Sequence, residues 1–216
     1  SFIMGCIPYV CDPEVKQILE TSGILDTGYT PTAQDIQVLE NAIDIYGIDA
    51  ISRFLEANGQ LGEYAFQALA ALVFTADLLG AESLIQDLSD GERKFVGGAF
   101  ELAYAVVHHD EIAGIEMPTF HMAKDLHEFT RPGPDIWMKD NSVVELKSFN
   151  FHKDYYVSHA NQVAEKVVDQ AFRRLEEGAT KVTIIFNERL GEMPDAFRNA
   201  LDRAIGGNPR VNFTLE

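Results

Sequence analysis

Basic residues, cysteines and long apolar runs are all scarce in this sequence. Lys and Arg together number 17 against 34 Asp and Glu, which gives a formal net charge of −17. Because contacts to phosphate groups need Lys and Arg, this balance argues against a simple nucleic-acid-binding protein. No uncharged apolar run reaches the roughly 18 residues that indicate a transmembrane helix, so the sequence predicts no stable membrane span.

The two cysteines, Cys6 and Cys11, lie near the N-terminus with no histidine close in sequence. A structural zinc site needs four ligands, so this pair does not make one by itself. Two free thiols and one disulfide that closes a short loop are both compatible with the spacing. Cysteine usage therefore leaves the redox environment open.

The acidity is concentrated in the first part of the chain. Residues 1–90 contain 14 acidic and 2 basic residues, whereas residues 91–216 contain 20 and 15. With 216 residues, 46% of them hydrophobic, the chain has room for one large domain or two small ones. The uneven charge favours two parts with different roles.

The periodicity of apolar residues also changes near residue 90. Before it, the sequence predicts a helical accessory domain with helices over 13–23, 30–47, 48–59, 61–79 and 82–91. After it, we expect the order α-β-β-β-α-β-α-β, an α/β domain with a mixed sheet and a parallel crossover after residue 143. The expected helices there are 91–111, 158–178 and 193–207, and the expected strands are 114–122, 134–139, 142–149, 181–188 and 210–216.

The segment VVELK, residues 143–147, alternates as a β-strand does. Side chains two apart on a strand lie on the same face, so Glu145 and Lys147 are expected side by side. The same Glu-x-Lys spacing begins at Glu14 and at Glu92, but in helical sequence, where residues two apart point in different directions. The spacing therefore gains meaning only from its surroundings.

Asp135 supplies those surroundings, because it follows Gly133-Pro134 and begins another short strand. Antiparallel pairing of this strand with 143–147, through a turn at 139–142, brings Asp135 close to Glu145. Two carboxylates together offer the oxygen ligands that a hard divalent cation prefers. Such a cation makes a bound water acidic, and Lys147 beside it can act as an electrostatic or proton-transferring group.

Asp135 followed by Glu145-x-Lys147 on a second strand resembles the motif of the PD-(D/E)XK nuclease superfamily, which has the restriction-endonuclease-like fold. The order α-β-β-β-α-β expected from about residue 92 to residue 187 is similar to the common core of that family. The resemblance covers residues 91–216 and leaves residues 1–90 outside it. It implies a metal-dependent nuclease that hydrolyses phosphodiester bonds in DNA or tRNA, with Mg²⁺ as the first choice of metal and Mn²⁺ or Zn²⁺ as alternatives.

The resemblance also implies further site residues. Many members add a glutamate from the first core helix to the metal site, and Glu101, an acid in an apolar helical segment, is the match here. Many also present a polar residue from the helix after the Glu-x-Lys strand, and Gln162 is the match, with Gln170 as the alternative. The expected catalytic set is therefore Asp135, Glu145, Lys147, Glu101 and Gln162, and the expected metal ligands are Asp135, Glu145 and Glu101.

Positive and aromatic side chains around this region are candidates for contacts with the substrate. We expect His152, Lys153 and Lys166 to bind it. The aromatic residues that interleave with Lys153 fit either base stacking or packing, and they are Phe149, Phe151, Tyr155 and Tyr156. Arg173 and Arg174 are interpreted as a solvated helix surface.

A nuclease of this fold behind an acidic helical region is similar to the toxin regions of bacterial polymorphic and contact-dependent growth inhibition systems. That similarity implies secretion or delivery from the cell surface, action in the target-cell cytoplasm, and a cognate immunity protein as partner. A DNA-repair or phage-type nuclease is one alternative. A catalytically silent nuclease fold that binds proteins is another, and a net charge of −17 suits it because it repels phosphate and attracts a basic partner.

Overall fold

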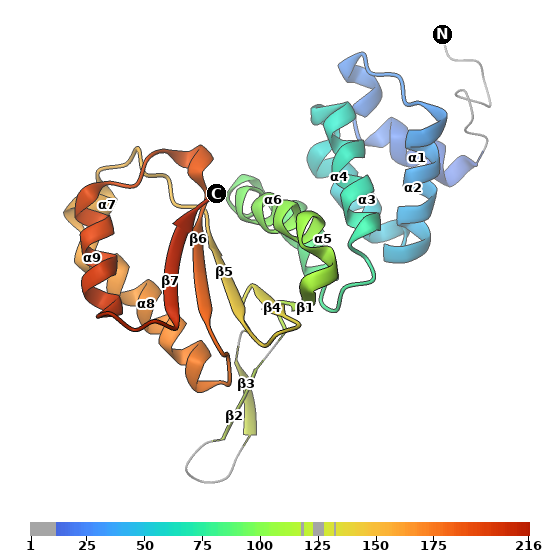
Figure 1. Cartoon of the computed structure of the whole chain (residues 1–216). Coiled ribbons are helices and arrows are strands. Elements are labelled where there is room, and N and C mark those ends of the chain that lie inside the picture. Colours follow the sequence, from blue (N-terminus) through green and yellow to red (C-terminus); the bar gives the residue numbers. More distant parts are fainter. Residues whose placement is uncertain (1–11, 118, 123–127, 132) are drawn as a thin grey trace. The chain divides into compact units, whose positions relative to one another are not determined.

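A computed structural model describes residues 12–117, 119–122, 128–131 and 133–216 (Figure 1). The expectations for Cys6 and Cys11 lie outside these residues. The chain divides into two compact units, residues 1–109 and residues 110–216. Each unit has its own helices or sheet and is described by itself.

The first unit is helical throughout its described part, as the sequence predicts. Asp12 caps the first helix, which begins with a proline, and Thr32 forms a capping box with Asp35 at the start of the second. The α-helices are α1 Pro13–Thr21, α2 Ala33–Tyr46, α3 Ile48–Asn58, α4 Glu63–Phe74, α5 Glu82–Leu88 and α6 Glu92–Val107. Their core consists of fully buried apolar side chains that recur at helical spacing, among them Leu19, Leu39, Phe54, Leu55, Leu69 and Leu84.

Helix α6 belongs to the same compact unit as the helices before it. The boundary between the two units therefore falls between His109 and Asp110 in the sequence. The domain boundary expected from the sequence lies earlier, between residues 90 and 91. The functional grouping of residues 91–216 as one domain stays a prediction. Within the described residues, no helix is both long and apolar enough to cross a membrane.

The second unit is built on a five-stranded mixed sheet in the order β1-β4-β5-β6-β7. The two pairings β1–β4 and β4–β5 are antiparallel, and β5–β6 and β6–β7 are parallel, which confirms the predicted crossover. The strands of this sheet are β1 Ile112–Ile115, β4 Ile136–Met138, β5 Val143–Lys147, β6 Val182–Phe186 and β7 Val211–Leu215. The α/β class is therefore confirmed as N-terminal helices followed by a mixed sheet interleaved with helices.

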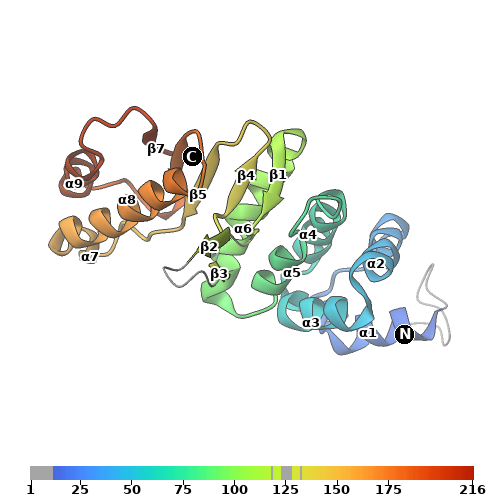
Figure 2. The same ribbon diagram turned by 90° about the horizontal axis from the view of Figure 1, so that it is seen from below.

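Helices α7 Tyr155–Ser158, α8 Ala160–Glu176 and α9 Asp195–Ile205 lie on one side of this sheet (Figure 1 and Figure 2). Alternate residues of the central strands point toward them, namely Val143, Val182, Ile184 and Phe186, and meet Ala164, Val168, Ala171, Phe197 and Leu201 from the helices. This packed layer holds β5 and α8 in a fixed register. The candidate site lies where β5 faces α8.

The expected single strand over residues 114–122 is wrong. Strand β1 ends at Ile115, and Glu116 adopts a left-handed backbone with φ of 48°, which extended structure does not allow. The chain then forms a separate two-stranded sheet, β2 Thr119–Met122 with β3 Glu128–Arg131, in antiparallel pairing. Pro118 within the expected strand is the sign of the break in the sequence, because proline cannot donate to a strand ladder.

Candidate functional site

A tight hairpin between β4 and β5 brings Asp135 to Glu145. The strands pair antiparallel with Ile136 opposite Val144, so the preceding residue, Asp135, comes next to Glu145. The connecting turn is closed by a bond from the Met138 N–H to the Ser142 carbonyl, 2.9 Å long. This pairing and its turn confirm the arrangement expected from the sequence.

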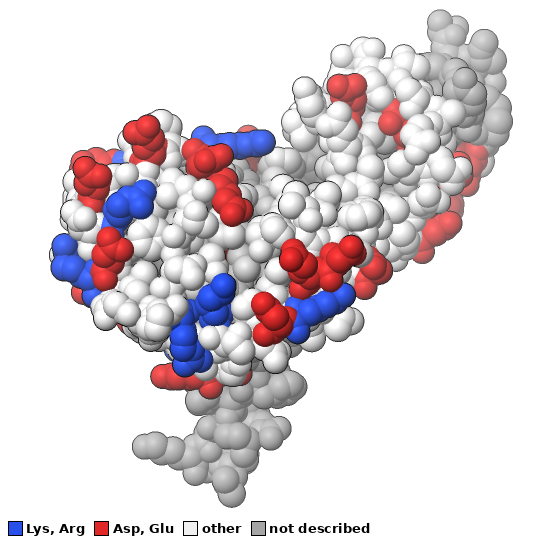
Figure 3. Space-filling model, viewed as in Figure 1, with Lys and Arg blue, Asp and Glu red and all other residues white. Residues whose placement is uncertain are grey.

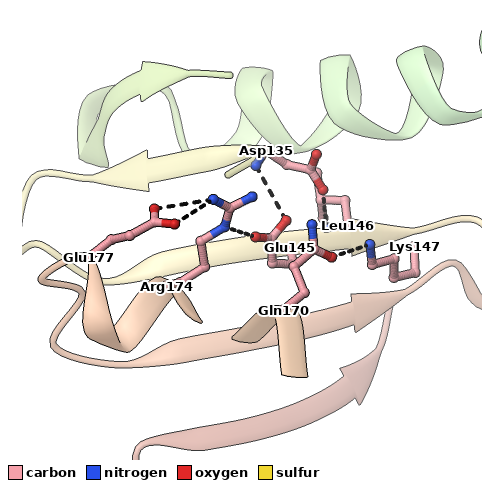
Figure 4. A network of polar contacts seen from close by, with 7 residues as sticks. All are labelled: Asp135, Glu145, Leu146, Lys147, Gln170, Arg174 and Glu177. Carbon is pink, nitrogen blue, oxygen red and sulfur yellow. Dashed lines mark hydrogen bonds and ion pairs between the residues drawn. The ribbon is translucent and has the colours of Figure 1, made fainter. Parts of the chain in front are cut away.

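Asp135 and Glu145 lie on neighbouring segments where the hairpin opens, with the Asp135 N–H toward Glu145 and the Asp135 carboxylate toward the Leu146 N–H (Figure 4). Glu145 is only 2% exposed, and Asp135 is partly buried. The Leu146 N–H donates to Asp135 Oδ2 at 2.7 Å, and the Asp135 N–H points at Glu145 Oε2 across a longer 3.4 Å. Backbone bonds thus fix both acids on adjacent strands.

The proximity of these acids changes the protonation of Asp135. Burial first, and the negative charge of Glu145 second, raise the pKa of Asp135 from 3.8 to about 7. The charge of Lys147 and the bond from Leu146 oppose this rise. A divalent cation beside Asp135 and Glu145 would relieve the repulsion between the two negative charges, as Lys147 does in part. Two carboxylates in such proximity are common at functional sites.

Lys147 lies on the same face of β5 as Glu145 and reaches helix α8. Its Nζ donates to Gln170 Oε1 at 3.0 Å. Glu145 contacts the same helix one turn further along, at Arg174. Two neighbouring side chains of β5 therefore meet successive turns of α8. The structure therefore places Gln170, the alternative to Gln162, against the lysine of the motif.

Gln162 lies two helical turns before Gln170, about 12 Å along the helix axis. It is exposed and borders a shallow hollow on the surface of α8, together with Lys166 and Arg173. Neither Gln162 nor Lys166 contacts Lys147 in the described structure. A role for them in binding substrate stays a prediction.

His152 and Lys153, the other expected substrate contacts, are exposed in the segment between β5 and α7. The His152 ring covers Gly191, where an added Cβ would lie 3.2 Å from Nε2. Gly191 has φ of 111°, so both its backbone and this contact favour glycine. The structure thus fixes where His152 lies but leaves its role a prediction.

The interpretation of Arg174 as a solvated residue is wrong. Arg174 is 5% exposed, and its Nε donates to Glu145 Oε1 at 2.8 Å. Its Nη1 reaches the two carboxylate oxygens of Glu177 at 3.2 and 3.3 Å. Burial disfavours the charged guanidinium, but the bonds to Glu145 and Glu177 outweigh it and raise the pKa of Arg174.

Helical periodicity contains the signal that separates Arg174 from Arg173. The buried stripe of α8 runs through Ala164, Val167, Val168 and Ala171, and Arg174 continues it at the next position. Arg173 falls off the stripe and is exposed. A buried arginine needs a carboxylate partner, so the stripe could have predicted the contact with the strand that it faces.

The aromatic side chains after β5 mostly pack together. Phe149 stacks on Tyr156 with ring centroids 4.9 Å apart, and Phe151 lies 5.5 Å from the ring of Phe197. Tyr155 differs, since it is 50% exposed. Of the two interpretations left open, packing is confirmed for Phe149, Phe151 and Tyr156.

Glu101 lies on α6 in the first compact unit, and it is 5% exposed. Its burial agrees with the expectation of an acid within an apolar helical segment. Asp135, Glu145 and Lys147 all belong to the second unit. Participation of Glu101 in their site stays a prediction.

The donor set of Asp135 and Glu145 suits a hard divalent cation. Arg174 takes Glu145 Oε1, which leaves Oε2 on the side of Asp135. Among the described residues, none donates a hydrogen bond to Asp135 Oδ1. Asp135 Oδ1 is thus available, and Glu145 Oε2 accepts only the long 3.4 Å bond from the Asp135 N–H. Mg²⁺ is commonly held in proteins by one or two carboxylates.

Comparison of the chain with protein-family models, with curated proteins and with solved structures found no match.

Proposed function

We propose that this protein is a metal-dependent nuclease that hydrolyses phosphodiester bonds in DNA or tRNA. The observation that carries the proposal is the meeting of Asp135, Glu145 and Lys147 on the β4–β5 hairpin. Three groups scattered over 13 positions of sequence come together because of one turn and one strand. The finer assignment of the sheet to the restriction-endonuclease-like fold, with α6 as its first core helix, is part of this proposal.

The roles follow from the chemistry of each side chain. Asp135 and Glu145 would hold Mg²⁺, with Mn²⁺ or Zn²⁺ as alternatives. Bound there, such a cation supplies acidity to a water and stabilises negative charge on a phosphate. Lys147, held by Gln170 at 3.0 Å, positions its ammonium group for the phosphate or for proton transfer.

Substitutions at the hairpin test these roles. We expect Glu145→Gln and Lys147→Ala each to lower the rate of metal-dependent cleavage by about 100-fold or more, because each removes a group that acts in the chemical step. Glu40→Gln is the matched control, since Glu40 is exposed on α2 and should leave the rate unchanged. The measurement is the single-turnover cleavage rate of a labelled polymer.

An unchanged rate in Glu145→Gln would contradict the proposal, provided that cleavage by the unmodified protein needs the metal. Equal loss in Glu40→Gln would show that the assay reports general damage to the fold. All three variants therefore need an unfolding curve beside the cleavage rate. Only a selective loss at Glu145 and Lys147 supports the assigned roles.

A second candidate function is a catalytically silent nuclease fold that binds a basic protein partner. The ion pair between Arg174 and Glu145 favours it, because a buried cation already satisfies the acid that would hold the metal. The net charge of −17 suits a basic partner as well. Absence of any stabilisation by Mn²⁺ that depends on Asp135 would favour this function over the nuclease.

The wider setting also stays a proposal. An acidic helical region before a nuclease suits a bacterial toxin neutralised by an immunity protein. A tight complex with a co-purifying inhibitor that blocks cleavage would support that setting. Cleavage by a protein with no such inhibitor would favour a DNA-repair or phage-type nuclease.

A further inference from the structure

A fixed positive charge lies directly on one of the candidate metal ligands. Arg174 Nε is 2.8 Å from Glu145 Oε1, and these two residues are only 5% and 2% exposed. On its other side, Arg174 Nη1 lies 3.2 Å from a carboxylate oxygen of Glu177 (Figure 4). The guanidinium is therefore clamped between two acids and has little freedom to withdraw.

This arrangement has two opposite effects on a divalent cation. The bond from Arg174 fixes the Glu145 carboxylate so that Oε2 lies on the side of Asp135. The same guanidinium repels a second cation at Glu145, and burial weakens the screening of that repulsion. Arg174 also competes for the negative charge that would otherwise attract the metal.

We propose that Arg174 is a positioning residue that orients Glu145 and restrains the affinity of the site for a divalent cation. This inference rests on the proposed metal site at Asp135 and Glu145. It goes beyond that site by assigning its affinity to a residue of α8. Glu145 is already paired with Arg174, so we expect the site to bind a divalent cation weakly.

The test is a Mn²⁺ titration at pH 8, read from the electron paramagnetic resonance signal of free Mn²⁺. Arg174→Met keeps an unbranched side chain but removes the charge, and we expect it to bind Mn²⁺ at least about tenfold more tightly. Arg173→Met is the matched control, because Arg173 is the exposed neighbour on the same helix. Its charge is screened by solvent, so we expect less than about a twofold change.

A purely structural role for Arg174 predicts the opposite result. Damage to the fold disorders Glu145 and weakens binding, whereas removal of a competing charge strengthens it. A second variant, Glu177→Gln, covers the case in which Arg174→Met does not fold. It frees Arg174 to interact with Glu145 alone, so we expect Mn²⁺ binding to weaken by a few fold.

Failure of this inference can be told from failure of the proposed site. If the unmodified protein binds Mn²⁺ and Asp135→Asn abolishes binding, the metal site stands. Equal or weaker binding by folded Arg174→Met, or unchanged binding by Glu177→Gln, then overturns the role of Arg174. No binding that depends on Asp135, in either the unmodified protein or Arg174→Met, overturns the proposed metal site and this inference together.

Discussion

At the scale of single residues, the site is defined by acids that would be unstable next to each other without compensation. Arg174 compensates the charge of Glu145, and a raised pKa compensates that of Asp135. The sequence could predict that Asp135 and Glu145 come close, because a strand period and a turn decide it. It could not predict Arg174 from the motif, since that contact depends on the register between α8 and β5.

The raised pKa of Asp135 predicts a change of stability with pH. The folded protein holds this proton more tightly than the unfolded chain, whose pKa stays near 3.8. Through this group, the free energy of unfolding without metal therefore falls as pH rises from about 4 to about 7, and the loss is complete above that range. The full effect is on the order of 4 kcal/mol at most.

Asp135→Asn removes the charge and keeps an oxygen for the Leu146 N–H. We expect the stability of this variant, relative to the unmodified protein, to improve by about 1–3 kcal/mol between pH 5 and pH 8 in EDTA. Urea unfolding at each pH measures it. Asp140→Asn is the control, because bonds from Ser142 lower the pKa of Asp140 below 3.8. Asp140 is therefore ionised in both the folded and the unfolded chain from pH 5 to pH 8, and we expect the relative stability of this variant to be constant there. A relative stability of Asp135→Asn that is constant across pH would contradict the account.

At the scale of elements, periodicity predicted most helices and strands because burial of one face decides both. Apolar spacing predicted helices α1 to α5, α8 and α9 and strands β5, β6 and β7. The break after β1 did not, since it depends on the backbone of Glu116 and not on an apolar pattern. Residues 119–122 were expected in a strand and form β2, whereas no strand was expected over β3.

Helix α8 gives a sharp contrast between neighbouring arginines. Arg174→Ala leaves Glu145 buried without its partner, and we expect a loss of about 3–5 kcal/mol in the free energy of unfolding. Arg173→Ala removes an exposed side chain, and we expect a change below about 0.5 kcal/mol. Urea unfolding at pH 7 distinguishes them. Similar losses of unfolding free energy in Arg174→Ala and Arg173→Ala would mean that Arg174 is not buried against Glu145.

At the scale of the whole molecule, most of the acidic excess lies in the first compact unit. Residues 1–109 contain 16 acidic and 4 basic residues, and residues 110–216 contain 18 and 13. Acidic side chains are visible over the N-terminal helices in the space-filling view (Figure 3). A polyanionic substrate is therefore expected to contact the second unit through few cations.

This balance predicts a shallow dependence of cleavage on salt. With Lys147 and one or two exposed lysines as phosphate contacts, the logarithm of kcat/KM should fall with the logarithm of salt concentration at a slope no steeper than about −3. The measurement is a series of initial rates in KCl at fixed free Mg²⁺. A slope steeper than about −5 would require a broad basic face and would contradict this expectation.

The central claim is that the β4–β5 hairpin hydrolyses phosphodiesters with the help of a divalent cation. The most direct measurement is cleavage of plasmid DNA, single-stranded DNA and total tRNA by the unmodified chain, with Mg²⁺, Mn²⁺, Zn²⁺ or EDTA. We expect at least one polymer to be cleaved in the presence of a metal and none to be cleaved in EDTA. We also expect Glu145→Gln to abolish the cleavage. No cleavage of any polymer with any metal, or cleavage that persists in EDTA, would contradict the central claim.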